Sequence, residues 1–217
     1  MCYIVRRTAH KPALHDGCVD PAWQRAQTLH VDHFHRQSSA HRPQTTARVL
    51  YDDDALFVLF QVHDRYVRSV VTAYQGPVSQ DSCVECFLQP KPASGYFNFE
   101  FNCGGTMLLG YVDPAKPGNE WRIEGKWGQT VSIAHSMPPV VDPEITDAVT
   151  WHLGFIAPLD LLEHFAGPLR PLAASTWRAN FFKCAKTSHP HWASWSPIGK
   201  ELSFHQVEYF APIVFGP

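Results

Sequence analysis

The most constraining feature of the sequence is the alternation of polar and apolar residues from Tyr96 to Asn102. Phenylalanines at positions 97, 99 and 101 are separated by polar residues throughout this stretch. Successive side chains of a β-strand point to opposite faces, so the period of two predicts a strand with one apolar and one polar face. A strand of this kind belongs in an antiparallel sheet that packs its apolar face against a core.

The rest of the sequence consists of short apolar runs separated by turn residues, with 18 prolines and 13 glycines in 217 residues. This spacing is typical of domains with many strands. Only residues 158–164 indicate a helix, because proline opens the segment and aspartate follows near its start. We predict an all-β fold, an antiparallel β-sandwich of jelly-roll type with one short helix, formed as a single domain over residues 1–217. The predicted strands cover residues 48–51, 55–64, 83–89, 96–103, 107–112, 121–124, 130–136, 149–157 and 177–184.

The charge composition argues against two classes of partner. The chain has 18 Lys and Arg against 20 Asp and Glu, a formal net charge of −2. Nucleic-acid and membrane-surface binding rely on clustered basic residues, so we predict neither kind of partner. No apolar run reaches the roughly 18 residues of a membrane span, and none follows the pattern of a secretory leader. We therefore expect a cytoplasmic location; the oligomeric state is left open.

Cysteine and histidine spacing does not define a metal site. Cys83 and Cys86 form a C-x-x-C pair, but residues three apart on a strand point to opposite faces. The six cysteines are therefore expected to be reduced thiols without disulfides. His33 and His35 would share a strand face, yet no further residue completes a zinc-binding spacing. A solvated polar edge is the favoured interpretation of these histidines, and the metal content stays open.

Polar residues on the predicted strands supply candidate ligand-binding groups. Asn98, Glu100 and Asn102 share one face of their strand, and Glu85 lies on the preceding strand, where it would face this row. Amide and carboxylate groups pair well with hydroxyls, so the row suits a ligand rich in hydroxyl groups. An ordinary solvated sheet face would show the same pattern.

A late strand carries a second polar row, formed by Arg178 and Asn180. Arg178 is also the expected ion-pair partner if Glu85 has a structural role, because buried carboxylates are rarely unpaired. Trp192 and Trp195 lie in a turn-rich segment and could stack on a sugar ring, although a single tryptophan is more often part of a core. Glu85 and Glu100 could alternatively be the carboxylate pair of a glycoside hydrolase.

Four blocks of sequence, in order, resemble the family 9 carbohydrate-binding modules. They are DGCVDPAW at 16–23, TARVLYDDDALFV at 46–58, DSCVECF at 81–87 with YFNFEFN at 96–102, and WRANF at 177–181 with WSP at 195–197, followed by Phe204, His205 and Phe210. The resemblance implies a jelly-roll sandwich that binds glycan ends without catalysis, often fused to glycoside hydrolases, and a structural calcium ion. It also implies a clamp of two tryptophans with Glu85 as the acidic hydrogen-bonding group, and it matches Arg178 and Asn180 to family positions.

One departure from the family pattern concerns this clamp. The segment before the acidic motif is Val78-Ser79-Gln80, where sugar-binding members carry a tryptophan. Trp192 or Trp195 would supply the other half. Related sandwiches also hold a b-type haem, for which Met107 or Met137 with His135 are conceivable ligands.

The sequence therefore predicts non-catalytic binding of glycan or oligosaccharide ends from plant-type or microbial polysaccharide, with a carbohydrate ligand and no required cofactor. The predicted sugar-binding residues are Glu85, Asn98, Glu100, Asn102, Arg178, Asn180, Trp192 and Trp195, and no catalytic residue is assigned. The alternatives are the glycoside hydrolase and the haem-binding sandwich.

Overall fold

The structure is a computed structural model that describes residues 1–14, 20–92, 94–113 and 122–216. The first half of the 16–23 sequence block and Trp121 lie outside the described residues. The strands are β1 (Tyr3–Arg7), β2 (Leu29–His30), β3 (His33–Phe34), β4 (Gln44–Tyr51), β5 (Ala55–Asp64), β6 (Val67–Ser69), β7 (Cys83–Gln89), β8 (Tyr96–Asn102), β9 (Met107–Val112), β10 (Ser132–His135), β11 (Val141–Ile145), β12 (Val149–Pro158), β13 (Thr176–Ala185), β14 (His191–Ser194) and β15 (Ala211–Phe215). The α-helix is α1 (Leu159–Ala166), and four short 3-10 helices are η1 (Pro21–Arg25), η2 (Val78–Gln80), η3 (Gly125–Thr130) and η4 (Val207–Tyr209).

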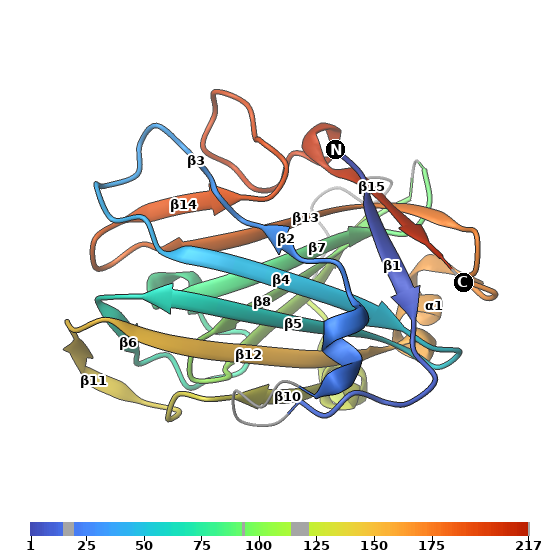
Figure 1. The fold of residues 1–217 in the computed structure, drawn as a ribbon, viewed down its shortest axis with the longest axis horizontal. Helices are drawn as coiled ribbons and strands as arrows, with labels where there is room; N and C mark the ends of the chain where they lie inside the picture. The colour runs from blue at the N-terminus through green and yellow to red at the C-terminus, as the bar shows by residue number, and fades with distance from the viewer. Residues whose placement is uncertain (15–19, 93, 114–121, 217) are drawn as a thin grey trace.

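One large sheet curls on itself to make both layers of a sandwich. Its strand order is β10-β12-β5-β4-β1-β15-β13-β7-β8-β9, and β6 pairs with β11 in a small second sheet. β1 joins the layers because its first half pairs with β15 and its second half with β4, both in parallel. Figure 1 shows β4, β5 and β12 running side by side, with β7, β8 and β13 in the other layer. The predicted all-β sandwich with one short helix is confirmed.

The predicted faces of the strands are also found. Phe97, Phe99 and Phe101 are all buried in the main core between the layers. β5 contributes to that core through one face, while Phe57 on its other face packs around Trp23 in a smaller cluster. Cys86 lies in the main core and Cys83 on the outer side of the same layer, as their spacing predicts. Cys2, Cys83, Cys86, Cys103 and Cys184 are free thiols, whereas Cys18 lies outside the described residues.

The polar face of β8 is not the open, solvated face that the alternation suggested. Every residue of β7 and β8 is buried. The chain itself covers the outer face, because Val78, Phe204 and Phe210 pack on Phe87 and Phe182 in a second apolar cluster. Sequence periodicity cannot show such a cover, since it arises from segments far away along the chain.

Three very short strands were not predicted from the sequence. β2 and β3 have two residues each, and β6 has three, so they are too short to show a period. Residues 121–124 were expected to form a strand, but the described part contributes only an isolated bridge between Arg122 and Gly110. Among the described residues, no helix is long and apolar enough to cross a membrane.

A buried ionic cluster ties the end of β5 to β13 and β14. The Lys183 ammonium lies 3.4 Å from a carboxylate oxygen of Asp64, and both side chains are almost fully buried. Lys183 Nζ also donates to Nε2 of His191 at 2.8 Å, while His41 Nε2 donates to Asp64 at 2.7 Å. Burial alone would raise the pKa of Asp64, but Lys183 and His41 hold it below its ordinary value.

We expect His191 to make the protein less stable in mild acid. Burial and the neighbouring Lys183 lower the pKa of this imidazole to about 3, against about 6.5 in an unfolded chain. Between these values the unfolded state binds a proton that the folded state does not. The stabilisation is therefore complete above pH 6.5, and roughly 2 kcal/mol is lost between pH 6.5 and pH 5.

Urea denaturation at several pH values between 7.5 and 5 measures this effect. His191→Gln should flatten the pH dependence of the unfolding free energy, whereas His30→Gln, at an exposed position, should not. An unchanged slope in His191→Gln contradicts the assignment.

Candidate functional site

A pocket of about 270 Å³ opens on the outer face of the layer that contains β7, β8 and β13. Its floor is formed by Glu85 of β7, Glu100 of β8 and Cys184 of β13. The remaining lining comes from η2, the residue after β13, β14 and the segment before η4, namely Ser79, Lys186, Trp192, Leu202, Ser203, Phe204 and His205. The pocket thus has a rigid three-stranded floor and a rim made by the segments that cover the rest of this face.

Two carboxyl groups face one another on this floor. Glu85 and Glu100 are directly opposite in the antiparallel register of β7 and β8, as predicted, and they are 3% and 8% exposed. Burial raises the pKa of both groups; for Glu85 the nearby Glu100 adds to the increase. Lys186 at the rim acts in the opposite sense on both. The pocket floor is therefore strongly polar and accepts hydrogen bonds.

The ion pair with Arg178, which was the structural alternative for Glu85, is not formed. The Arg178 guanidinium donates instead to the backbone carbonyls of Glu208 and Phe210, at distances between 2.7 and 3.0 Å. Arg178 lies opposite Gln89, whereas Glu85 lies opposite Phe182, so the two charges are several residues apart along the strands. The thiol of Cys184 donates to Glu85 instead, with its Sγ 3.2 Å from Oε1.

Trp192 is the predicted tryptophan that reaches the pocket. It lies in β14 opposite Cys184 and is half-buried against the second apolar cluster. Ser79, from the segment where family members carry a tryptophan, also lines the pocket. Trp195 is 5% exposed and packs edge-on against Tyr3 and Phe181 in the main core.

Two of the predicted asparagines make structural hydrogen bonds within the fold. Asn102 donates to Val71 O and Asp81 and accepts from the Thr106 amide, so it holds the loop after β8. Asn180 donates to Ser196 O and accepts from the Ser196 amide, which fixes the chain after Trp195. Neither residue lines the pocket.

Asn98 lies on the same face of β8, fully buried and outside the pocket lining. Neither atom of its amide makes a hydrogen bond of good geometry with a described residue. The amide still lowers the pKa of Glu100, against the larger effect of burial.

His205 and Lys186 are pocket residues that sequence analysis did not select. The His205 ring contacts Phe87, and its Nδ1 is hydrogen-bonded to the Tyr96 hydroxyl at 2.7 Å. Burial lowers the pKa of His205, which favours the neutral ring. His205 belongs to a block quoted for the family resemblance, but its long separation from Glu85 in sequence gave no sign that the two would meet.

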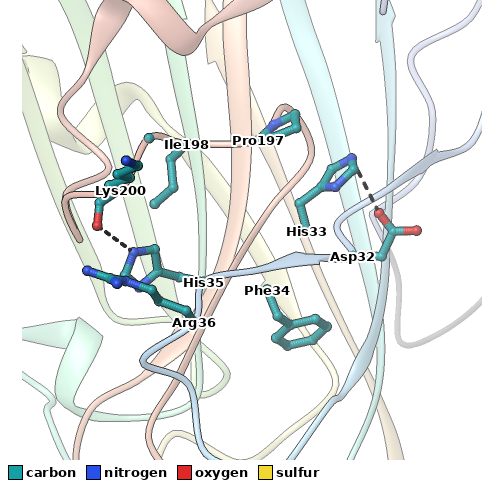
Figure 2. A pocket seen from close by; sticks show the side chains of 9 residues that line it. Asp32, His33, Phe34, His35, Arg36, Pro197, Ile198 and Lys200 are labelled. Atoms are coloured by element: carbon teal, nitrogen blue, oxygen red, sulfur yellow. Dashed lines mark hydrogen bonds and ion pairs between the residues drawn. The ribbon is translucent and has the colours of Figure 1, made fainter.

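A second, more open groove lies between β3 and residues 197–200, with a volume of about 560 Å³. Figure 2 shows His33 beside Asp32, at 3.9 Å, and His35 bonded to the backbone carbonyl of Lys200. His33 is exposed, in agreement with the predicted polar edge, whereas His35 is 7% exposed. Asp32 is the only carboxylate in this lining, so the paired carboxyl groups of the first pocket make it the better candidate.

The fold and the first pocket together define a β-sandwich module with a small polar pocket on one face. The sequence model described as Carbohydrate-binding family 9 matches residues 19–215. The chain therefore belongs to carbohydrate-binding family 9, as its four sequence blocks indicated. No curated protein matches the sequence.

Solved structures show the same fold. A putative carbohydrate-binding protein from Bacteroides uniformis has a TM-score of 0.88 at 22% identity, over 99% of this chain and 98% of that chain. A family 9 carbohydrate-binding module from Caldicellulosiruptor kristjanssonii in complex with cellotriose has a TM-score of 0.67 at 14% identity, over 100% and 94% of the two chains. A family 9 module from the same organism in complex with glucose has a TM-score of 0.64 at 15% identity, over 99% and 96%.

Proposed function

We propose that this chain binds the end of a glycan or oligosaccharide, without catalysis, in the pocket formed by Glu85, Glu100 and Trp192. The observation that carries the proposal is the juxtaposition of two facing carboxyl groups with an indole ring in one pocket. Sugar hydroxyls can donate to the carboxyl oxygens, and the apolar face of a sugar ring can pack on the indole.

The size of the pocket favours a chain end. Its volume of about 270 Å³ lies at the lower limit of the roughly 300–1,000 Å³ that small-molecule sites occupy. A pocket this small has room for a terminal unit rather than for a long stretch of polysaccharide. The resemblance to modules that are fused to glycoside hydrolases supports a role beside polysaccharide breakdown.

The pocket holds one tryptophan, and a serine stands at the other position of the expected clamp. We propose that Trp192 stacks on the sugar and that Ser79, Ser203 and His205 contact its hydroxyls from the rim. The other predicted residues lie outside the pocket lining and would then support the pocket through the fold rather than touch the ligand; they are Asn98, Asn102, Arg178, Asn180 and Trp195.

The glycoside hydrolase alternative is less well supported. Such enzymes need one carboxyl group protonated and the other ionised. Burial raises the pKa of both Glu85 and Glu100, which does not distinguish the two functions. The family model that matches the chain describes carbohydrate binding, and this match favours binding. The haem-binding alternative is also poorly supported. Its conceivable ligands Met107 and Met137 are buried in the main core, and Nδ1 of His135 is hydrogen-bonded to the Met137 carbonyl.

No cluster of His, Cys, Asp and Glu side chains among the described residues identifies where the calcium ion implied by the family resemblance would bind. Calcium prefers six to eight oxygen ligands. Among the described His, Cys, Asp and Glu side chains, the one group of three or more whose ligand atoms converge contains two cysteines. We therefore assign no structural role to calcium.

We expect Trp192→Ala and Glu100→Gln each to weaken glycan binding by about 10- to 150-fold. The first change removes the stacking surface. The second places an amide donor where a hydroxyl proton needs an acceptor, and a hydrogen bond to a charged group contributes about 1.5–3 kcal/mol. Calorimetric titration with the best ligand from a glycan array, beginning with cellotriose and glucose, measures the change.

Matched controls are Trp127→Ala and Glu208→Gln, which alter the same residue types outside the pocket lining. If the two pocket variants fold and bind as tightly as the parent while cellotriose binding persists, the pocket assignment is wrong. Hydrolysis of aryl glycosides that Glu85→Gln abolishes would replace the proposal with the hydrolase alternative.

A further inference from the structure

Two cysteines and a glutamate converge beneath the pocket. Cys83 and Cys184 are directly opposite in the antiparallel register of β7 and β13, and Glu85 follows Cys83 on the same face of β7. Their ligand atoms, two sulfurs and a carboxylate oxygen, all lie within 4.8 Å of one another. The Cys184 and Cys83 sulfurs are 3.2 and 3.9 Å from Oε1 of Glu85.

This group is buried and makes no ion pair at contact distance, although Lys186 at the pocket rim acts on Glu85 from farther away. Cys83, Glu85 and Cys184 are at most 3% exposed. Among the ion pairs of the described residues, none includes Glu85 or Glu100. The ammonium of Lys183, next in sequence to Cys184, points to the other face, where it meets Asp64. A buried carboxyl group without a cation at ion-pair distance is unusual in a folded protein, because burial penalises the charged form.

We propose that Cys83, Cys184 and Glu85 form a zinc site whose fourth position opens into the pocket. Zinc combines thiolate and carboxylate ligands in tetrahedral geometry, with bonds of about 2.3 Å to sulfur and about 2.0–2.2 Å to oxygen. Neighbouring ligand atoms of such a tetrahedron are about 3.3–3.8 Å apart, close to the two sulfur–oxygen distances of this group. The thiol protons leave to solvent when the sulfurs bind the metal as thiolates.

The types of ligand in this group favour zinc over calcium and magnesium. Two thiolates are soft ligands and disfavour calcium and magnesium, which take oxygen. Cys184 and Glu85 line the pocket, while Cys83 lies behind them and does not. Three protein ligands with one side open is the arrangement of zinc sites that keep a position for water or a ligand oxygen. Zinc binding at this site does not depend on the proposed sugar binding, and its uptake is measured without any sugar.

The test uses the full chain with its cysteines reduced. A chelator first removes any bound metal, and the chelator is then removed. We expect one zinc ion per chain, measured by metal analysis after gel filtration and by competition with a chromophoric chelator. Cobalt(II) in place of zinc should give thiolate-to-metal charge-transfer absorption. Cys184→Ser and Glu85→Gln should each weaken zinc binding by roughly 100-fold or more, since the loss of even an outer-shell partner costs 10–100-fold.

Cys86→Ser is the matched control, because Cys86 is buried on the opposite face of the same strand. It should retain the zinc and the cobalt absorption, as should Trp192→Ala and Glu100→Gln, which test the sugar pocket separately. Circular dichroism of each variant establishes that it is folded. Failure of the reduced parent to take up one zinc overturns the proposal, as does equal loss of zinc in Cys86→Ser and Cys184→Ser. A Cys83–Cys184 disulfide in the isolated protein, with no zinc uptake after reduction, assigns the pair to redox chemistry instead.

Discussion

Replacing Lys183 by methionine is expected to lower the free energy of unfolding by about 3–5 kcal/mol. The Lys183 side chain is fully buried, and its ammonium lies 3.4 Å from Asp64, whose side chain is 1% exposed. Methionine fills a similar volume but removes the charge. The carboxylate of Asp64 then stays buried with only His41, Trp151 and a backbone amide as donors. Removing one partner of a buried ion pair costs this much because the other charge is left uncompensated.

Urea denaturation at pH 7.5 measures this loss. The dependence of the unfolding free energy on urea concentration should be the same in the parent and the variant. Lys200→Met is the control, since Lys200 is exposed, and surface changes usually stay within about 0.5 kcal/mol. Adding Asp64→Asn to Lys183→Met should restore part of the stability, because the unpaired charge is then gone. If Lys183→Met is as stable as the parent, the buried pair does not contribute in this way.

Phe155→Ala is expected to destabilise the protein by about 3–5 kcal/mol. Phe155 lies on β12 and is completely buried. Its ring centroid is 5.1 Å from that of Phe99 and 4.8 Å from that of Phe101, so it joins the two layers of the sandwich. Truncation removes the transfer energy of the ring and leaves a cavity between strands that are held in place by their ladders.

Phe155→Leu should cost clearly less than Phe155→Ala, because it keeps most of the volume. Val140→Ala, at a position that is 51% exposed, should be nearly neutral. Equal stability of the two Phe155 variants would show that the site collapses around a truncated side chain.

Long strands with a clear period were predictable from the sequence. The predicted ranges 55–64 and 83–89 coincide with β5 and β7, and the residues that face the core follow from the period of two. Their side chains alternate between two different environments, which produces a period of two in the local sequence. β3 has two residues, which are too few to show this period, and it is defined by its pairing with β14.

The facing of Glu85 and Glu100 was predictable because β7 and β8 are neighbours along the chain and pair as a hairpin. The choice between the tryptophans was not. Trp192 and Trp195 are three residues apart, and one lines the pocket while the other packs between Tyr3 and Phe181. The difference depends on which elements lie above and below β14, and nothing in the local sequence records it.

The sequence alone therefore determined the family, the class of fold and the inner and outer faces of the long strands, because each of these follows from local periodicity and motif order. Tertiary structure decided what covers the outer face. Residues 196–210 fold back over β7, β8 and β13 and turn a predicted open sheet face into a small pocket. It also brought Cys184 beside Cys83 across about a hundred residues of chain. Contacts between distant segments depend on the packing of the whole sheet, so the sequence around either residue carries no signal of them.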